Sequence, residues 1–157
     1  KIILSGGGHS MAAGFTLEKK NLIDFEELIR KDFKTKKIFL NDIFTYDTEL
    51  STIGFNKDIY NEIKKIGPFG LGNPIPLFYL KDLKVIKSTI LNKKHVSCVL
   101  KSKLGLSINS ISFHSYNTKI GEHLLNYKKY FNVVGQINEN FWNNKKTLQL
   151  IIKDITL

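Results

Sequence analysis

The feature that most constrains this chain is a run of three glycines, Gly6 to Gly8, between a short apolar segment and a histidine. Glycine permits positive φ angles and has no Cβ, so a ligand can approach bare backbone N–H groups there. The small residues after His9 suit a tight helical turn, and unsatisfied N–H groups at the start of a helix bind anions. The segment therefore predicts a phosphate site formed by Gly6, Gly7, Gly8 and His9, with His9 donating a hydrogen bond to a phosphate oxygen. A glycine-rich turn with a packed histidine explains the same residues without a ligand.

Charge is distributed unevenly along the chain. Residues 1–76 carry 11 Lys/Arg and 10 Asp/Glu, whereas residues 77–157 carry 13 Lys and 4 Asp/Glu, so the second part holds +9 of the net charge of +10. Such asymmetry is typical of a domain that binds a polyanion. Compositional drift toward lysine is the alternative. Drift explains why lysine outnumbers arginine, but it does not explain why acidic residues are scarce in the second part.

Two helices are predicted in the first part of the chain. Apolar residues at helical spacing predict a helix over residues 22–33, with Asn21 as its N-cap. Asn56 is expected to cap a second helix, which Gly67 and Pro68 end because glycine suits the C-terminal position and proline cannot continue the helix.

A strand and a proline-rich loop complete the first part. Residues 43–50 alternate in hydrophobicity and predict a strand, with Asp47 and Glu49 as an outward pair that we interpret as plain surface rather than as metal ligands. The loop over residues 68–76 holds all three prolines of the chain. We interpret this loop as a linker or as a second functional loop. Because the charge balance changes just after it, a domain boundary is predicted near Pro76.

Residues 77–157 predict an all-β domain with one helix. Five strand-like segments are expected, over residues 78–90, 95–102, 106–113, 130–137 and 147–155, with a short helix over residues 120–127 between the third and the fourth. The hydrophobic phase slips by one within the third strand, which predicts a β-bulge near Asn109 and Ser110. Five strands with a helix in this place is the plan of an OB-fold β-barrel.

OB-folds bind single strands with a basic groove and with aromatic rings on which bases stack. Trp142 lies in a polar turn and is expected to be exposed, and with the adjacent Lys145 and Lys146 it forms the best candidate cluster. Each other aromatic residue is more often part of the core. The full set of candidates for single-strand binding is Lys94, Lys101, Phe113, Tyr116, Phe141, Trp142, Lys145 and Lys146.

Several functions lack the residues they need. The sequence contains no GxxxxGK[ST], HExxH or paired CxxC motif, and no carboxylate cluster of the kind a two-metal nuclease requires, so no metal site is expected in this chain. Cys98 is expected to be a small core residue. No apolar run is long enough for a membrane span and no leader is visible, which favours the cytoplasm. Because Lys1 precedes a strand already under way, we expect a C-terminal piece of a longer protein.

Two motifs resemble a known family. The segment Ser5 to Gly14 resembles the signature of the DHH-associated domain, and the segment Pro68 to Pro76 is similar to a motif of the RecJ family, the single-strand-specific 5′→3′ DNA exonucleases of bacteria. The residues from Gln136, and those over 148–155, are similar to the end of that family's OB domain. The resemblance covers essentially all of the chain, and both motifs in this order are far more specific than either alone.

The resemblance implies an α+β protein. It would have a partial, small α/β DHH-associated domain over residues 1–76 and a five-stranded OB-fold barrel over residues 77–157. Gly6, Gly7, Gly8 and His9 would bind phosphate near the scissile bond, and His9 would contribute to catalysis by contacting it. Phe69, Gly70, Gly72 and Asn73 would shape an interdomain loop.

The resemblance also implies partners and a cofactor. Single-stranded DNA would be the substrate, with an N-terminal DHH domain of the same chain and single-strand-binding protein as partners. Mn²⁺ or Mg²⁺ would be held by that DHH domain and not by this fragment. The chain departs from the family in having a single arginine, Arg30, so lysines must replace the bidentate arginine–phosphate contacts.

Two alternatives stay open at this point. One is a non-catalytic module that binds single-stranded nucleic acid and never had a nuclease domain. The other is a phosphatase or short-oligonucleotide nuclease with the same glycine–histidine loop, which is disfavoured because such relatives usually lack the OB domain and the Pro68 to Pro76 segment.

Overall fold

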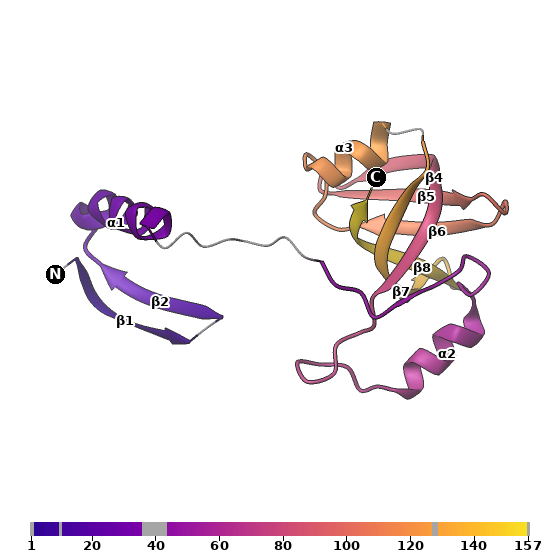
Figure 1. Cartoon of the computed structure of the whole chain (residues 1–157), viewed down its shortest axis with the longest axis horizontal. Helices are drawn as coiled ribbons and strands as arrows, with labels where there is room; N and C mark the ends of the chain where they lie inside the picture. The colour runs from indigo at the N-terminus through magenta and orange to yellow at the C-terminus, as the bar shows by residue number, and fades with distance from the viewer. Residues whose placement is uncertain (1, 10, 36–43, 127–128, 157) are drawn as a thin grey trace. The chain divides into compact units, whose positions relative to one another are not determined.

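The computed structural model describes residues 2–9, 11–35, 44–126 and 129–156. Contacts divide the chain into two compact units, residues 1–43 and 44–157 (Figure 1). This division falls earlier than the boundary predicted near Pro76. The reason is that residues before Pro76 belong to the second unit's core, where Ile63 is buried among the strand residues and Leu50 and Phe55 pack against them.

The first unit is a β-hairpin followed by a helix. β1 (Ile3–His9) pairs antiparallel with β2 (Ala12–Leu17), and a 3₁₀ turn, η1 (Lys19–Asn21), leads into α1 (Leu22–Thr35). The helix predicted over residues 22–33 is confirmed. Asn21 does not act as its N-cap, since it lies in the 3₁₀ turn and its side-chain amide donates to the carbonyl of Ile2 at 3.5 Å.

The second unit is built on a closed barrel. Its five strands are β4 (Phe78–Leu91), β5 (His95–Ser102), β6 (Ser107–Ser112), β7 (Phe131–Trp142) and β8 (Lys145–Thr156). They lie in the order β4-β5-β6-β8-β7, and β7 pairs back onto β4 to close the sheet. The β6–β8 pairing is parallel and the other pairings within the barrel are antiparallel. This is the predicted OB-fold plan.

Three short elements accompany the barrel. β3 (Thr48–Glu49) pairs in parallel with the start of β4, so the strand predicted over residues 43–50 is reduced to two residues within the described part of that range. α2 (Lys57–Lys65) begins at Asn56, whose side chain accepts from the N–H groups of Asp58 and Ile59, as predicted for its N-cap. α3 (Lys119–Asn126) lies between β6 and β7 in the sequence, and Figure 1 shows it at the end of the barrel away from α2.

The barrel interior is filled by alternate residues of its strands. Leu80, Leu100, Val133 and Leu150 have no exposed surface. Cys98 is buried with them, and burial raises the pKa of its thiol to about 12, which keeps the thiol neutral and agrees with a core role.

The β-bulge predicted near Asn109 and Ser110 is absent from the described strand. The β5–β6 register runs without a shift from Val96↔Ser112 to Lys101↔Ser107. The hydrophobic phase slips because Ser110 takes an inward position, where its hydroxyl donates to the carbonyl of Ile108 at 3.2 Å, while Ile111 faces outward and is nevertheless 7% exposed.

Candidate nucleic-acid interface and phosphate site

The glycine run lies in a strand of the first unit. Gly6 to Gly8 belong to β1, and β2 follows them instead of a helix. The predicted helical turn after His9 is therefore wrong, and a helix N-terminus supplies no anion site at this place. The small residues of this segment show no hydrophobic periodicity that would predict a strand. The strand conformation is instead determined by the pairing of β1 with β2.

The two faces of this hairpin differ in the space that a side chain would have at the glycine positions. A Cβ at Gly8 would lie 2.6 Å from the carbonyl oxygen of Ala12 and 2.7 Å from Cα of Ala13, so close strand packing requires glycine there. A Cβ at Gly7 or at its partner Gly14 would meet nothing within 4 Å. Packing therefore does not explain Gly7 and Gly14, and together they leave an open backbone patch on one face of the hairpin.

Polar side chains border that patch. Because paired residues share a face and alternate residues of a strand do so too, the register places Ser5, Thr16 and His9 on the same face as Gly7 and Gly14. All of them are exposed. Phe15, on the other face, contacts Phe25 of α1 with ring centroids 4.5 Å apart. We name the open face, Ser5, Gly7, His9, Gly14 and Thr16, the glycine face.

His9 is held in a defined orientation. The backbone N–H of Met11 donates to its Nδ1 at 3.2 Å. In the neutral ring Nε2 therefore carries the proton, and it can donate to an oxyanion. The glycine face offers one hydrogen-bond donor from His9, two hydroxyl groups and a backbone open to close approach, which suits a phosphate group.

In the second unit, the outward face of β4, β5 and β6 is basic. The register places Lys84 opposite Lys101, Lys87 opposite Val99, and Asn109 opposite Val99 on the β6 side. None of the ion pairs found among the described residues involves Lys84, Lys87 or Lys101. We name this surface, together with its continuation over β8, the outer face. Lys84 and Lys87 were not among the predicted binding residues, because only pairing brings them beside Lys101.

The β4–β5 turn forms one end of the outer face. Lys94 lies in this turn, and its carbonyl accepts from the N–H of Tyr116, so the turn is tied to the segment after β6. The N–H of His114 donates to Nδ1 of His95 at 2.8 Å, and the ring of Phe113 meets that of His95 edge-on, with centroids 5.2 Å apart. The structure thus brings Lys94, Phe113 and Tyr116 together around His95, which sequence reasoning had missed.

The electrostatics of this end favour a neutral His95. Partial burial lowers its pKa, and the nearby His114 and Lys94 lower it further. Phe113 is 49% exposed. A half-exposed ring fixed beside a neutral imidazole is a preformed platform on which a base can stack.

The β7–β8 turn extends the outer face in the other direction. Asn143 and Asn144, with φ of 48° and 57°, make the two-residue turn that joins the strands, which lies within the polar turn predicted at Trp142. Trp142 is paired with Lys145 and is 75% exposed, which confirms its predicted exposure. Asn140, Trp142 and Lys145 line one shallow hollow.

The predicted cluster around this turn is divided between two faces. Phe141 pairs with Lys146, one residue out of phase with the pair of Trp142 and Lys145, so it points to the opposite face of the hairpin. Lys146 is also held by Glu139, with Nζ 3.3 Å from the carboxylate. The structure therefore assigns Trp142 and Lys145 to the outer face and separates Lys146 and Phe141 from them.

The loop over residues 67–76 is held by its own hydrogen bonds. The N–H of Gly70 donates to the carbonyl of Asn73 at 2.9 Å, and the side-chain amide of Asn73 donates to the carbonyls of Ile66 and Pro68. Phe69 packs against the barrel core. A Cβ at Gly70 or Gly72 would meet nothing within 4 Å. An interdomain role for these residues stays a prediction.

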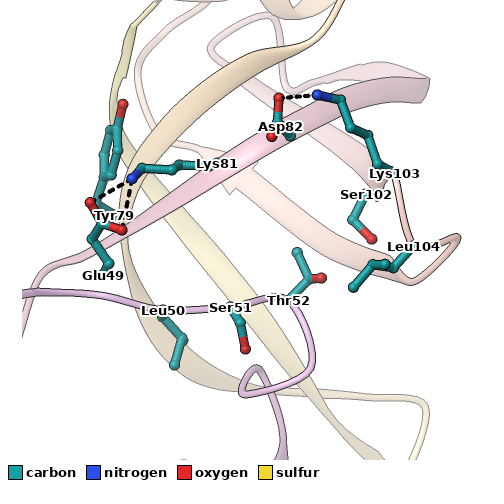
Figure 2. Close-up of a pocket in the computed structure, with 10 residues that line it drawn as sticks. All are labelled: Glu49, Leu50, Ser51, Thr52, Tyr79, Lys81, Asp82, Ser102, Lys103 and Leu104. Atoms are coloured by element: carbon teal, nitrogen blue, oxygen red, sulfur yellow. Dashed lines mark hydrogen bonds and ion pairs between the residues drawn. The ribbon is translucent and has the colours of Figure 1, made fainter.

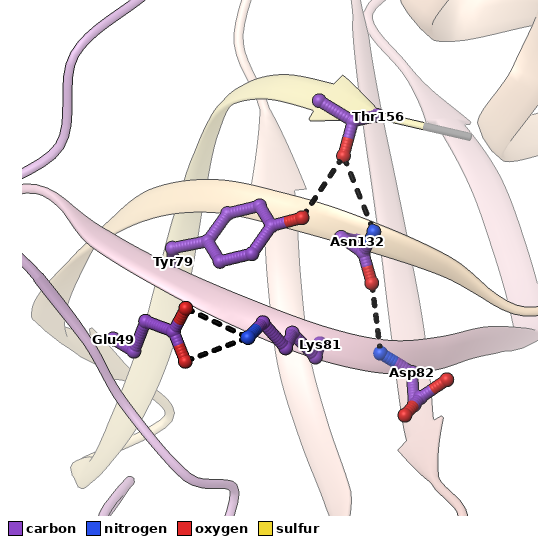
Figure 3. A network of polar contacts seen from close by, with 6 residues as sticks. All are labelled: Glu49, Tyr79, Lys81, Asp82, Asn132 and Thr156. Carbon is purple, nitrogen blue, oxygen red and sulfur yellow. Dashed lines mark hydrogen bonds and ion pairs between the residues drawn. The ribbon is translucent and has the colours of Figure 1, made fainter.

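The acidic pair considered as metal ligands has structural roles. Asp47 accepts from the N–H of Leu77 at 2.8 Å, and Glu49 holds Lys81 with both oxygens, at 2.7 and 2.8 Å. Figure 3 shows the polar network of which the Glu49–Lys81 pair is part. Within residues 2–9, 11–35, 44–126 and 129–156, no group of three or more His, Cys, Asp or Glu could hold a metal ion.

The strand order and closure of the barrel define an OB-fold protein. The chain belongs to the RecJ OB domain family, whose model matches residues 46–154. It is 29% identical to the single-stranded-DNA-specific exonuclease RecJ of Haemophilus influenzae over 96% of this chain, and 26% identical to the RecJ of Bacillus subtilis over 94%. It spans only 26% and 19% of the length of these relatives.

A solved structure supports the fold. The crystal structure of RecJ from Thermus thermophilus in complex with Mn²⁺ matches 99% of this chain and 22% of its own chain, with a TM-score of 0.66 at 21% identity. A second structure of that protein, in complex with Mg²⁺, matches with a TM-score of 0.64. Among the residues that the structure describes here, no helix is both long and apolar enough to cross a membrane.

Proposed function

We propose that this chain is the substrate-binding, C-terminal portion of a RecJ-like, single-strand-specific 5′→3′ DNA exonuclease. The observation that carries this proposal is the outer face, where none of the ion pairs among the described residues involves Lys84, Lys87 or Lys101, and where Phe113 and Trp142 are exposed. The names of the relatives support DNA as the polyanion and support the reaction.

The outer face suits a single strand for two physical reasons. Lysines that contact phosphates release condensed counterions, which favours binding at low salt. Phe113 and Trp142 offer flat apolar surfaces for bases, and a base can reach them only when it is not paired and stacked inside a duplex. The face therefore binds the sugar-phosphate chain at its lysines and the bases at its two ends, and it disfavours duplex DNA.

The glycine face has a different part in the same proposal. Nε2–H of His9 donates to a phosphate oxygen, the hydroxyls of Ser5 and Thr16 add donors, and the bare backbone at Gly7 and Gly14 lets the phosphate approach closely. Holding the phosphate in a fixed orientation lowers the entropy cost of reaching the transition state. His9 is in this sense a catalytic residue of the whole enzyme.

The metal ions belong to another part of the proposed enzyme. The described residues hold no cluster that fits Mn²⁺ or Mg²⁺. The family resemblance assigns the metals to a DHH domain of the same protein, where they would activate water and stabilise the phosphodiester oxygens. It also supports single-strand-binding protein as a partner and the cytoplasm as the location.

The test is a binding and cleavage experiment on the purified chain. Fluorescence anisotropy with a labelled thymidine octamer should show binding that weakens with salt, and a matched duplex should bind more weakly. Each lysine–phosphate contact contributes about −0.7 to the slope of log K against log salt for a single strand, so Lys101→Ala should reduce the slope by about that amount. Lys65→Ala, which removes a lysine already paired with Glu62 on α2, is the matched control and should leave the slope unchanged.

Two outcomes would contradict the proposal. Equal affinity for single-stranded and duplex DNA would remove the strand preference. Cleavage of the octamer by this chain with Mn²⁺ would contradict a portion that binds substrate without holding the metals. If the octamer binds as expected but the gene encodes no metal-binding domain beside this chain, the non-catalytic binding module becomes the function.

A further inference from the structure

Strand β4 carries one more residue than β5 at a point where the two strands pair. Val85 pairs with Leu100 and Lys87 pairs with Val99, so Ile86 and Lys87 together oppose the single residue Val99. This arrangement is a β-bulge, which bends a strand and changes the direction of a side chain. It lies within the paired part of the two strands and not at either end.

The bulge turns two neighbouring side chains to the same face. Val85 packs against the barrel core, and Ser88 pairs with the buried Cys98, so both positions face inward. In a regular strand one outward residue separates two inward residues, whereas here both Ile86 and Lys87 lie between them. Both are exposed, Ile86 to 53%. The bulge therefore places Ile86 beside Lys87 on the outer face.

A single exposed isoleucine is ordinary, and the neighbours of Ile86 are what distinguish it. Across the bulge lies Val99, which is half-buried and faces outward on β5. Two residues further along the same face, Lys84 and Lys101 pair with each other, and Lys87 borders the apolar pair on its other side. We name these five residues, Lys84, Ile86, Lys87, Val99 and Lys101, the bulge site.

The lysines of the bulge site can take an anion. None of the ion pairs found among the described residues involves any of the three. The lysines around the cavity shown in Figure 2 differ, because Lys81 is held there by Glu49 and Lys103 by Asp82. The bulge site therefore combines an apolar floor with a positively charged rim.

A nucleotide of a single strand uses both parts of the bulge site. A free phosphate would contact the lysines alone, and an uncharged apolar group would contact Ile86 and Val99 alone. A nucleotide carries an anionic phosphate and a base whose flat face packs on apolar surface. The side chain of Ile86 has no hydrogen-bonding group, so it cannot distinguish the edge of one base from that of another. Such a contact suits a strand of any sequence.

We propose that the bulge of β4 presents Ile86 as a platform for one base of the bound single strand, while the three lysines of the bulge site bind the flanking phosphates. This inference rests on the proposed function and extends it, because it adds a base contact that does not depend on the identity of the base. The bulge is then a binding device, since it is what brings an apolar side chain and a lysine, adjacent in sequence, to one face.

The experiment measures the affinity of the whole chain for three labelled probes by fluorescence anisotropy. The probes are a thymidine octamer, a deoxycytidine octamer and an octamer with every base removed. Ile86→Ala should weaken binding of both base-containing octamers about 2- to 10-fold, since each methylene group that a base covers contributes roughly fourfold, and should leave the abasic octamer unchanged. Ile86→Phe keeps an apolar platform of larger area and should bind both octamers at least as tightly as the unmodified chain.

The matched control is Ile53→Ala, which shortens an isoleucine that is 64% exposed in the segment between β3 and α2, and it should affect no probe. Unchanged affinity of Ile86→Ala for the two octamers, or an equal loss with the abasic probe, would overturn the inference and leave the proposed function standing. A loss confined to one of the two sequences would overturn it too, because an aliphatic platform does not read base edges. If the unmodified chain binds none of the three probes, the proposed function itself fails.

Discussion

The structure separates two adjacent aromatic residues that the sequence grouped among the candidates for single-strand binding. Trp142 and Phe141 are both exposed, at 75% and 62%, and both lie beside the β7–β8 turn. The pairing places Trp142 with Lys145 on the outer face and Phe141 with Lys146 on the opposite face. Trp142→Ala should therefore weaken single-strand binding, and Phe141→Ala should not.

The size of the difference follows from the contacts each ring makes. A base stacked on an aromatic ring contributes about 1–3 kcal/mol, so Trp142→Ala should raise Kd about 5- to 150-fold. Each substitution also removes one cross-strand pair, worth about 0.2–1 kcal/mol of stability. Because both residues lose a similar pair, the two variants should melt at similar temperatures, and their difference in affinity reports binding alone.

The assay is fluorescence anisotropy with a labelled thymidine octamer at a fixed low salt concentration, beside a thermal melt of each variant. The expected result is a large rise in Kd for Trp142→Ala and a change of less than about twofold for Phe141→Ala, well below the effect of one stacked base. Equal effects of the two substitutions, or a larger effect for Phe141, would refute the assignment of the outer face.

Four further predictions follow from single contacts. Gly8→Ala should destabilise the first unit, because its Cβ would lie 2.6 Å from a backbone oxygen, whereas Gly7→Ala should fold normally; equal stability in hydrogen exchange of the hairpin would contradict this. Asn56→Ala should lower the free energy of unfolding by about 1 kcal/mol through loss of the N-cap, and an unchanged denaturation midpoint would show that the cap contributes nothing. His95 has a pKa below 6.5 in the folded chain, so the stability it contributes is present above pH 6.5 and is lost as pH falls from there; an NMR titration midpoint at or above 6.5 would refute the contacts described. Cys98, with a pKa of about 12, should not react with a thiol reagent at neutral pH until the barrel unfolds, and rapid labelling of the folded chain would contradict its burial.

Local features of the sequence predicted the local structure well. The α1 helix and the N-cap at Asn56 depend on residues three or four positions apart, and the two-residue turn at Asn143 and Asn144 needs side chains that tolerate positive φ. The number and order of the barrel strands were also predictable, because each strand ends at a recognisable turn.

Features set by pairing between strands were not predictable from the residues of one strand alone. The glycine run is a strand because β2, which begins after two intervening residues, pairs with it, and the residues Gly6 to Gly8 do not themselves indicate that pairing. The absence of a bulge in β6 depends on Ser110 occupying an inward position and on Ile111 lying beside Ile151 of β8. The outer face is likewise a product of register, since Lys84, Lys87 and Lys101 are spread over two strands.

The same argument applies to the candidate sites, whose binding roles stay predictions. Trp142, Lys145, Lys101, Lys94 and Phe113 were named from composition and expected exposure, and the register pairs Trp142 with Lys145 and Lys101 with Lys84. Lys146 and Phe141 were grouped with them only because they are neighbours in sequence, and alternation along a strand sends neighbours to opposite faces.

The central claim is that the outer face of the barrel binds a single strand, and an NMR titration of the isotope-labelled chain with a thymidine octamer tests it most directly. The account predicts that the amide signals of Lys101, Phe113 and Trp142 shift with the same dissociation constant while those of α2 stay in place. Shifts confined to α2, or no shift on the outer face at saturating octamer, would contradict it.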